Sequence, residues 1–294
     1  MENTKKTIKV INPHGFCGGV SHALKVAKEA IENPNTKKPI YLLGNLIHNK
    51  IVTKSLSDSG VSTIDIKGKS RLELLDYIDS GTVIFSAHGV SDSVREKAIN
   101  KGLNIIDASC GKVLLIHKKV KNYIKEGYQI LYIGKKGHPE AESILEEDSR
   151  IKLIEKVDDI PLTLSSEKIY VTNQTTLSII ETKDIYDKIS AIYPNAILDN
   201  NICNATTERQ LALTNLEGID LCIVVGDKLS SNSRSLVEIA RTKSRVDSCL
   251  VENKDDITSE LISKYNHIAL TSSASCPEEV FLQVIEKVKE CITL

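Results

Sequence analysis

Three equally spaced cysteines constrain the fold of this chain more than any other feature. Cys17, Cys110 and Cys203 are separated by 93 residues and then by 93 residues again. Each follows an apolar run typical of a strand and precedes a pattern typical of a helix. A unit of strand, cysteine and helix that recurs three times predicts three structural repeats.

Other landmarks recur in the same order within each repeat. An apolar run that ends in glycine comes first, at 41–44, 131–134 and 221–226. A polar loop follows four residues after each glycine, and a second apolar run then ends in another polar loop. The first three loops are His48-Asn49, His138-Pro139-Glu140 and Ser230-Ser231-Asn232, and the second three are Ser86-Ala87-His88-Gly89, Thr172-Asn173-Gln174-Thr175-Thr176 and Ser272-Ser273-Ala274-Ser275. These matched landmarks argue against a coincidence of cysteine spacing.

The alternation of strand and helix patterns predicts the fold class. Strands alternating with helices of about 10 to 15 residues indicate βαβ units, whose ligand-binding loops lie at the carboxyl ends of parallel strands. We therefore predict an α/β fold with three pseudo-repeated lobes and mainly parallel sheets. The predicted lobes are 18–109, 110–202 and 203–294, the last completed by the N-terminal strand at 7–17. Around an approximate threefold axis, such lobes would bring the three cysteines to a central iron–sulfur or other metal site.

The cysteines fall into two groups. Three convergent thiolates favour zinc or an iron–sulfur cluster over magnesium or calcium. In a [4Fe-4S] cluster, three cysteine ligands leave one iron open, which suits substrate binding. A helix N-terminus after each of these cysteines would stabilise its thiolate. We expect structural roles for the others, although Cys276 adjoins a proposed site loop; the others are Cys222, Cys249 and Cys291.

The polar loops favour a phosphate-bearing substrate. Hydroxyl, amide and imidazole groups, together with helix N-termini, donate hydrogen bonds to phosphate oxygens. The candidate binding residues are His48, His88, His138, Thr175, Ser230, Ser231, Asn232 and Ser275, and Glu140 is the carboxylate beside them. The sequence has no phosphate-binding P-loop and no complete dinucleotide fingerprint, so nucleotide binding is not indicated. Four histidines outside matched positions are expected to be structural: His14, His22, His117 and His267.

Composition narrows the classes of partner and compartment. The 38 lysines and arginines almost balance 39 aspartates and glutamates, which argues against a nucleic-acid or anionic-membrane partner. No apolar run approaches the roughly 18 residues of a membrane span, and the N-terminus lacks the apolar region of a signal peptide. An odd count of seven cysteines without a CxxC pair is atypical of a secreted disulfide framework. We therefore expect a cytoplasmic protein, and a monomer.

Six motifs resemble those of the 4-hydroxy-3-methylbut-2-enyl diphosphate reductase family, in order and over almost the whole chain. They are Gly15-Phe16-Cys17-Gly18-Gly19-Val20, Ile47-His48-Asn49-Lys50, Ser86-Ala87-His88-Gly89-Val90, Gly137-His138-Pro139-Glu140, Asn173-Gln174-Thr175-Thr176 and Ser230-Ser231-Asn232-Ser233. The resemblance implies a three-lobed α/β fold around one [4Fe-4S] cluster. It also implies the last step of the non-mevalonate isoprenoid pathway, in which the allylic diphosphate is reductively dehydroxylated to isopentenyl diphosphate and dimethylallyl diphosphate.

The same resemblance assigns roles to individual residues. It makes Cys17, Cys110 and Cys203 the cluster ligands, Glu140 the proton donor and Thr175 the residue that orients the substrate. The remaining matched positions would bind substrate: His48, His88, His138, Ser230, Ser231, Asn232 and Ser275. Ferredoxin or flavodoxin would donate single electrons. Several neighbours depart from the usual family pattern, namely His14, Ser109, Gly111, Asn204, Arg234 and Cys276.

Two other functions fit parts of the pattern. Three cysteines and an activated water would suit a zinc hydrolase. A non-catalytic iron–sulfur sensor or electron carrier would also use the cysteines, but it would have no use for the histidine and serine loops. Metal and sulfide analysis separates the first alternative from the reductase, and tight diphosphate binding excludes the second.

Overall fold

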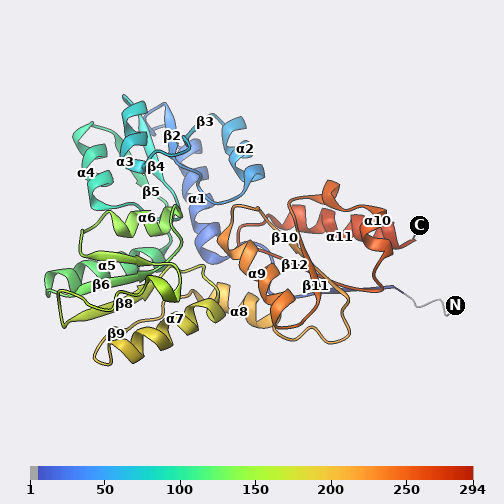
Figure 1. Cartoon of the computed structure of the whole chain (residues 1–294). Helices are drawn as coiled ribbons and strands as arrows, with labels where there is room; N and C mark the ends of the chain where they lie inside the picture. The colour runs from blue at the N-terminus through green and yellow to red at the C-terminus, as the bar shows by residue number, and fades with distance from the viewer. Residues whose placement is uncertain (1–5, 294) are drawn as a thin grey trace. The chain divides into compact units, whose positions relative to one another are not determined.

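A computed structural model describes residues 6–293 of the chain (Figure 1). The described residues form two compact units. One comprises 18–47 and 51–203, and the other comprises 6–17, 48–50 and 204–293. No helix within residues 6–293 is both long enough and apolar enough to cross a membrane.

The larger unit contains two four-stranded sheets in which all strand pairs are parallel. The first has the order β3-β2-β4-β5, and the second has the order β7-β6-β8-β9. The strands are β2 (Ile40–Leu43), β3 (Val61–Ile64), β4 (Thr82–Phe85), β5 (Asn104–Asp107), β6 (Gln129–Ile133), β7 (Ile151–Ile154), β8 (Ile169–Asn173) and β9 (Ile197–Leu198). The helices are α1 (Gly18–Glu32), α2 (Lys50–Asp58, whose first residue belongs to the other unit), α3 (Arg71–Leu74), α4 (Asp92–Asn100), α5 (Gly111–Lys125), α6 (Pro139–Leu145) and α7 (Ile179–Ile192), with 3₁₀ turns η1 (Leu75–Tyr77) and η2 (Val157–Asp159).

The smaller unit contains the third sheet, with the order β1-β12-β10-β11, again entirely parallel. Its strands are β1 (Thr7–Val10), β10 (Leu221–Val225), β11 (Asp247–Val251) and β12 (His267–Ser272). Its helices are α8 (Asn204–Ala212), α9 (Ser231–Thr242), α10 (Ser259–Ser263) and α11 (Glu278–Thr293), with the 3₁₀ turn η3 (Lys254–Asp256). The N-terminal strand therefore forms one edge of a sheet whose other strands lie near the C-terminus.

The three sheets share one topology. In each sheet, one strand (β2, β6 or β10) lies between the two strands that follow it in the chain. The second of these two strands (β4, β8 or β12) also pairs with an edge strand, which is β5, β9 or β1 respectively. This order confirms the predicted α/β fold with three parallel-sheet lobes. The limits 18–109, 110–202 and 203–294 stay predictions.

Two details of the predicted elements were wrong. Thr172, Asn173 and Ser272 were expected in loops but are the last residues of strands, because they continue the ladders opposite Tyr132, Ile133 and Val225. Several helices are also shorter than expected, since α6 and α10 span 7 and 5 residues. The strand ends therefore lie slightly closer to the site loops than the sequence pattern indicates.

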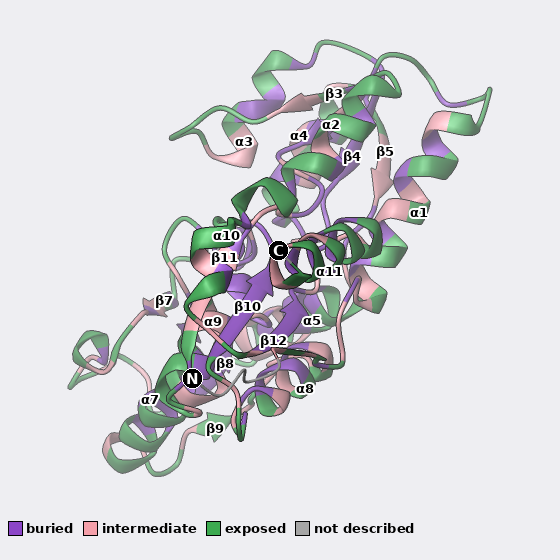
Figure 2. Cartoon of the chain, turned by 90° about the vertical axis from the view of Figure 1, so that its right-hand side faces the viewer, coloured by how far each residue is buried: buried purple, intermediate pink, exposed green. Residues whose placement is uncertain are grey.

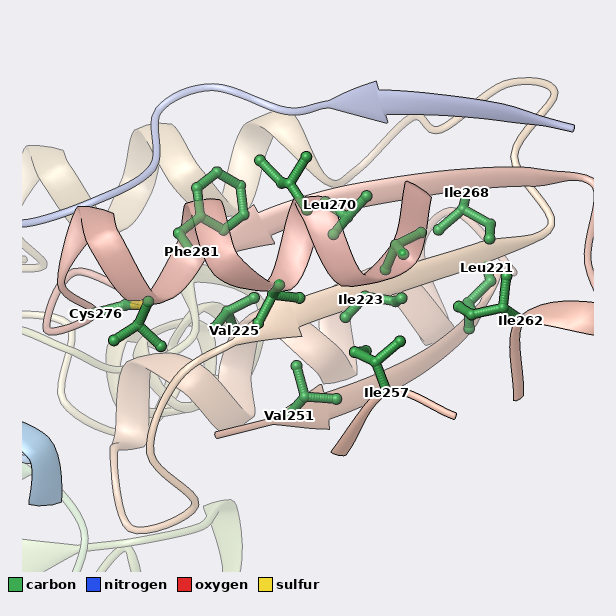
Figure 3. Packing of buried hydrophobic residues seen from close by; sticks show 14 residues of the cluster. Leu221, Ile223, Val225, Val251, Ile257, Ile262, Ile268, Leu270, Cys276 and Phe281 are labelled. Carbon is green, nitrogen blue, oxygen red and sulfur yellow. The ribbon is translucent and has the colours of Figure 1, made fainter. Parts of the chain in front are cut away.

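Apolar packing fixes the sheet of the smaller unit beneath one helix. Strand β10 is buried at all five positions, and alternate side chains of a strand point to opposite faces. Leu221, Ile223 and Val225 pack with Phe281 of α11 in one cluster (Figure 3). Figure 2 shows β10 buried along its length and β12 buried after its first residue. This buried sheet supports the loops that follow its strands.

Candidate active site

The three repeat cysteines occupy equivalent places in the three lobes. Cys17, Cys110 and Cys203 each directly precede a helix, α1, α5 and α8 respectively, and each is half-buried. Each follows the edge strand of its sheet, namely β1, β5 or β9. Their thiols therefore stand at helix N-termini.

A matched backbone hydrogen bond holds each cysteine in place. The N–H of Cys17 donates to the carbonyl of Ala274 at 3.1 Å, and that of Cys110 donates to Ala87 at 3.0 Å. The N–H of Cys203 donates to the carbonyl of Thr175 at 3.0 Å. All three acceptors lie in the polar loop after the neighbouring strand, which is β12, β4 or β8. The cysteine loops and the predicted binding loops are therefore joined within each sheet.

Glu140 and Thr175 form a buried acid–hydroxyl pair in the larger unit. Oε1 of Glu140 accepts the backbone N–H of Thr175 at 2.7 Å, and Oε2 accepts the Thr175 hydroxyl at 2.9 Å. Only 2% of Glu140 is exposed. Burial raises the pKa of Glu140 to about 7, although both Thr175 hydrogen bonds act in the opposite direction. The geometry thus provides a carboxyl group that can carry a proton near neutral pH.

The sequence around Glu140 explains its position. His138 caps the N-terminus of α6, and Pro139 is its first residue, where proline is well tolerated. The backbone N–H of Glu140 donates to Nδ1 of His138 at 3.2 Å. In the neutral ring, this leaves the proton on Nε2, so His138 presents an N–H donor.

His88 lies beside His138. The ring centroids are 5.6 Å apart, with the rings nearly perpendicular. Nδ1 of His88 lies 3.2 Å from the hydroxyl of Ser86. The structure therefore brings together four of the predicted site residues of this unit: His88, His138, Glu140 and Thr175.

In the smaller unit, the predicted serine and asparagine residues gather after β10 and β12. Ser230 caps α9, and its hydroxyl accepts the N–H of Ser233 at 3.3 Å. Ser231 and Asn232 form the first turn of that helix and are buried. Ser275 is 8% exposed and lies in the loop after β12. Asn49 Nδ2 donates to the Ser275 carbonyl at 3.0 Å, which joins the loop of half-buried His48 to this group.

Several buried polar atoms of this group have no protein partner within residues 6–293. They are Oδ1 and Nδ2 of Asn232 and the hydroxyls of Ser233, Ser273 and Ser275. A buried polar atom without a hydrogen bond is energetically costly, and bound ligand commonly supplies the missing partner. A Cβ at Gly226 would lie 2.4 Å from the Ser233 hydroxyl and 2.5 Å from that of Ser273. Glycine at this position leaves room for both hydroxyls.

Sequence reasoning did not single out Ser233 and Ser273 as site residues. The two serines belong to the polar runs that it identified, and only the folded chain shows that their hydroxyls are buried without a partner among residues 6–293. Cys276, by contrast, is 1% exposed and packs in the apolar cluster of β10 and α11 (Figure 3). Burial raises its thiol pKa to about 12, which argues against a role as a ligand.

Other histidines have local structural partners. In His117, Nδ1 lies 2.8 Å from Oε1 of Glu147 and Nε2 lies 3.1 Å from the Ser143 hydroxyl. His14 contacts Glu278 at 3.1 Å and the ring of Phe281. These contacts support the structural roles expected for both residues.

A family comparison places this site in context. The family model described as "LytB protein" matches residues 8–289. This chain belongs to the LytB protein family. Among LytB relatives, 4-hydroxy-3-methylbut-2-enyl diphosphate reductase of an Exiguobacterium species is 40% identical over 95% of this chain and 89% of its own length. The protein of the same name from Geobacillus kaustophilus is 40% identical over 94% of this chain and 88% of its own length.

Solved structures of such reductases share this LytB fold. The E-1-hydroxy-2-methyl-but-2-enyl-4-diphosphate reductase of Plasmodium falciparum superposes with a TM-score of 0.87 at 34% identity, covering 96% of this chain and 87% of the other. A second structure, of (E)-4-hydroxy-3-methyl-but-2-enyl diphosphate reductase, superposes with a TM-score of 0.66 at 28% identity, covering 97% of this chain and 99% of the other. These findings confirm the family resemblance read from the six motifs.

Proposed function

We propose that this protein is a 4-hydroxy-3-methylbut-2-enyl diphosphate reductase. It reductively removes the allylic hydroxyl group and forms isopentenyl diphosphate and dimethylallyl diphosphate. The substrate takes up two electrons and two protons, the C–O bond breaks, and the hydroxyl leaves as water. Family membership over residues 8–289 supports the reaction class, and the buried Glu140–Thr175 pair is the observation that carries the mechanism.

The donor set suits one [4Fe-4S] cluster. Cys17, Cys110 and Cys203 provide one half-buried thiol from each lobe, each directly before a helix. Soft thiolates match iron–sulfur chemistry, and three of them leave one iron with an open coordination position. When bound, such a cluster supplies single electrons and a Lewis-acidic site for the substrate hydroxyl.

The diphosphate is bound by neutral donors of this chain. His88 and His138 offer imidazole N–H groups, and the unpartnered atoms of Asn232 and Ser275 offer further hydrogen bonds. The N-terminus of α9 adds the partial positive charge that favours phosphate groups. The proposed binding set is His48, His88, His138, Thr175, Ser230, Ser231, Asn232 and Ser275.

Glu140 delivers a proton during the reaction. Its carboxyl group is buried and has a pKa of about 7, so a substantial fraction is protonated under neutral conditions. Thr175 contacts both carboxyl oxygens and orients the acid toward the substrate. A general acid placed in this way commonly contributes about 10² to 10⁴ in rate.

The setting of the enzyme forms part of the same proposal. It acts in the cytoplasm as a monomer and takes electrons from ferredoxin or flavodoxin. Seven cysteines without a CxxC pair support a compartment in which thiols stay reduced. Turnover with either reduced protein, and the molecular mass in solution, test these points.

The decisive experiment begins with anaerobic purification and measurement of iron and sulfide per chain. Turnover is then followed with the allylic diphosphate and a chemical reductant. Four irons and four sulfides per chain together with both isoprenoid products support the proposal. Zinc with hydrolysis of the substrate would favour the hydrolase, and a cluster without diphosphate binding would favour a sensor or electron carrier.

A further inference from the structure

Arg71 donates hydrogen bonds to three separate segments of the larger unit, two of which carry His88 and His138. Its Nε donates to the carbonyl of Leu43 at 3.2 Å, at the end of β2. Its Nη1 donates to the carbonyl of Pro139 at 3.3 Å, between His138 and Glu140 in the chain. Its Nη2 donates to the hydroxyl of Ser86 at 3.0 Å, in the loop that carries His88.

All three acceptors of Arg71 are uncharged. Within residues 6–293, no carboxylate lies within ion-pair distance of its guanidinium. The charges of Asp65 and Glu146 act on Arg71 from a distance, and these carboxylates accept hydrogen bonds from Asn45 and Ser91. Burial lowers the pKa of Arg71 to about 10, so the group still carries its positive charge at neutral pH. Arg71 is half-buried, and a partly buried cation without a contacting anion has an energetic cost that a bound anion nearby offsets.

The contact with Ser86 also favours one tautomer of His88. A guanidinium only donates hydrogen bonds, so the Ser86 oxygen accepts from Arg71. The hydroxyl hydrogen is then available to Nδ1 of His88, 3.2 Å away. With Nδ1 accepting this hydrogen, the proton of the neutral ring resides on Nε2. His138 reaches the same state through the Glu140 N–H, so both imidazoles present an Nε2–H donor.

We infer that Arg71 is a positioning residue for the diphosphate group of the substrate, acting through Ser86 and His88. It holds His88 in the donor tautomer, ties this loop to the start of α6, and supplies a positive charge that no protein carboxylate neutralises by contact. This inference rests on the proposed function, since the anion is the diphosphate of that substrate.

The test compares variants of the anaerobically purified, cluster-loaded protein. Arg71→Gln removes the charge and the fork of donors, whereas Ser86→Ala keeps the charge and removes only the link to His88. Arg150→Gln is the matched control, because it removes an arginine of the same unit that donates to Asp148 and to the Ile124 carbonyl. The readouts are the Kd for inorganic pyrophosphate, KM, kcat and iron per chain.

We expect Arg71→Gln to raise the pyrophosphate Kd and KM by about tenfold or more, the usual effect of losing a hydrogen bond to a charged group. Both kcat and iron content should change by less than about threefold, which corresponds to about 0.6 kcal/mol. Ser86→Ala should show the same direction with a smaller effect, and Arg150→Gln should match the wild type.

A double-mutant cycle separates this role from simple support of the fold. In the His88→Asn background, Arg71→Gln should lose most of its effect on the pyrophosphate Kd. Both changes disrupt the same series of contacts, which runs from Arg71 through Ser86 to His88. Wild-type affinity in Arg71→Gln and Ser86→Ala, or full additivity with His88→Asn, would overturn the inference while leaving the reductase proposal intact. A wild-type protein that neither binds pyrophosphate nor turns over substrate would overturn both.

Discussion

At Glu140, two opposing influences act on the same carboxyl group. Removal from water favours the neutral acid, whereas the N–H and O–H of Thr175 favour the carboxylate. Burial is the larger influence, and the pKa rises from 4.5 to about 7. A glutamate in the first turn of a helix is ordinarily an ionised group that stabilises the helix. The surroundings of Glu140 convert it into an acid.

This raised pKa predicts how stability depends on pH. The folded chain holds the Glu140 proton more tightly than the unfolded chain does, so this contribution is fully present below pH 4.5 and is lost as pH rises to about 7. The loss corresponds to roughly 3 kcal/mol of unfolding free energy. We expect Glu140→Gln to remove this part of the pH dependence. Urea unfolding of both proteins at pH 5 and pH 8 measures the difference, and parallel changes in the two proteins would contradict it.

The catalytic role of Glu140 gives a second prediction. Glu140→Gln keeps the shape of the side chain but has no carboxylic proton, so turnover should fall by about 10² to 10⁴. Iron content and diphosphate affinity should stay near those of the wild type. Glu142→Gln is the matched control, since it makes the same change in the same turn of α6. An unchanged single-turnover dehydroxylation rate in Glu140→Gln, with a full cluster and bound substrate, would show that Glu140 only supports the helix.

At the scale of elements, the junction of β10 with α9 depends on the absence of one side chain. Gly226 directly follows the buried strand, and the hydroxyls of Ser233 and Ser273 occupy the space where a Cβ would stand. The loop carrying Ser230 then leads directly into α9. This close packing lets a strand end, a helix N-terminus and a serine loop meet.

Gly226→Ala should disturb this junction. The added methyl group forces the two serines to shift, and such overpacking typically lowers the unfolding free energy by about 1 to 3 kcal/mol. Diphosphate affinity should fall as well, because the displaced residues belong to the proposed binding group. Gly111→Ala is the control, since a Cβ there meets nothing within 4 Å. Urea unfolding and pyrophosphate calorimetry give the two readouts, and equal behaviour of the two variants would show that the junction adapts.

For the whole molecule, the repeat of 93 residues acquires a topological explanation. Each repeat cysteine follows the edge strand of a sheet, and in the third sheet this strand is β1 from the N-terminus. Cys17 therefore follows the edge strand of the third sheet, whereas Cys110 and Cys203 follow the edge strands of the first and second sheets. One lobe of chain separates each pair of cysteines, which accounts for their equal spacing.

This equivalence predicts the cluster ligands. Serine in place of Cys17, Cys110 or Cys203 should abolish or strongly reduce iron binding, because each variant removes one of three soft ligands. Cys291→Ser is the control, since this half-buried thiol lies in α11 and outside the repeat. Iron and sulfide per chain, measured without oxygen, provide the test. A full cluster in Cys110→Ser would rule out ligation by these three cysteines.

The sequence by itself determined the three-lobed parallel-sheet fold and the identity of most candidate residues. Strand and helix patterns are local, and the carboxyl ends of parallel strands necessarily place the polar loops along one edge of each sheet. The motifs around Cys17, His88 and Glu140 added the family. The precise ends of β8 and β12 escaped prediction, since the ladder to a neighbouring strand decided them.

Only the tertiary structure decided the properties that arise between distant residues. The pKa of Glu140 depends on burial and on Thr175, 35 residues away. Arg71 meets Pro139 across 68 residues, and no local pattern marks that contact. Whether the hydroxyls of Ser233 and Ser273 find partners depends on how β10 and β12 are packed. Desolvation, charge balance and hydrogen-bond satisfaction are set by all surrounding atoms, so they become visible only when the folded chain brings those atoms together.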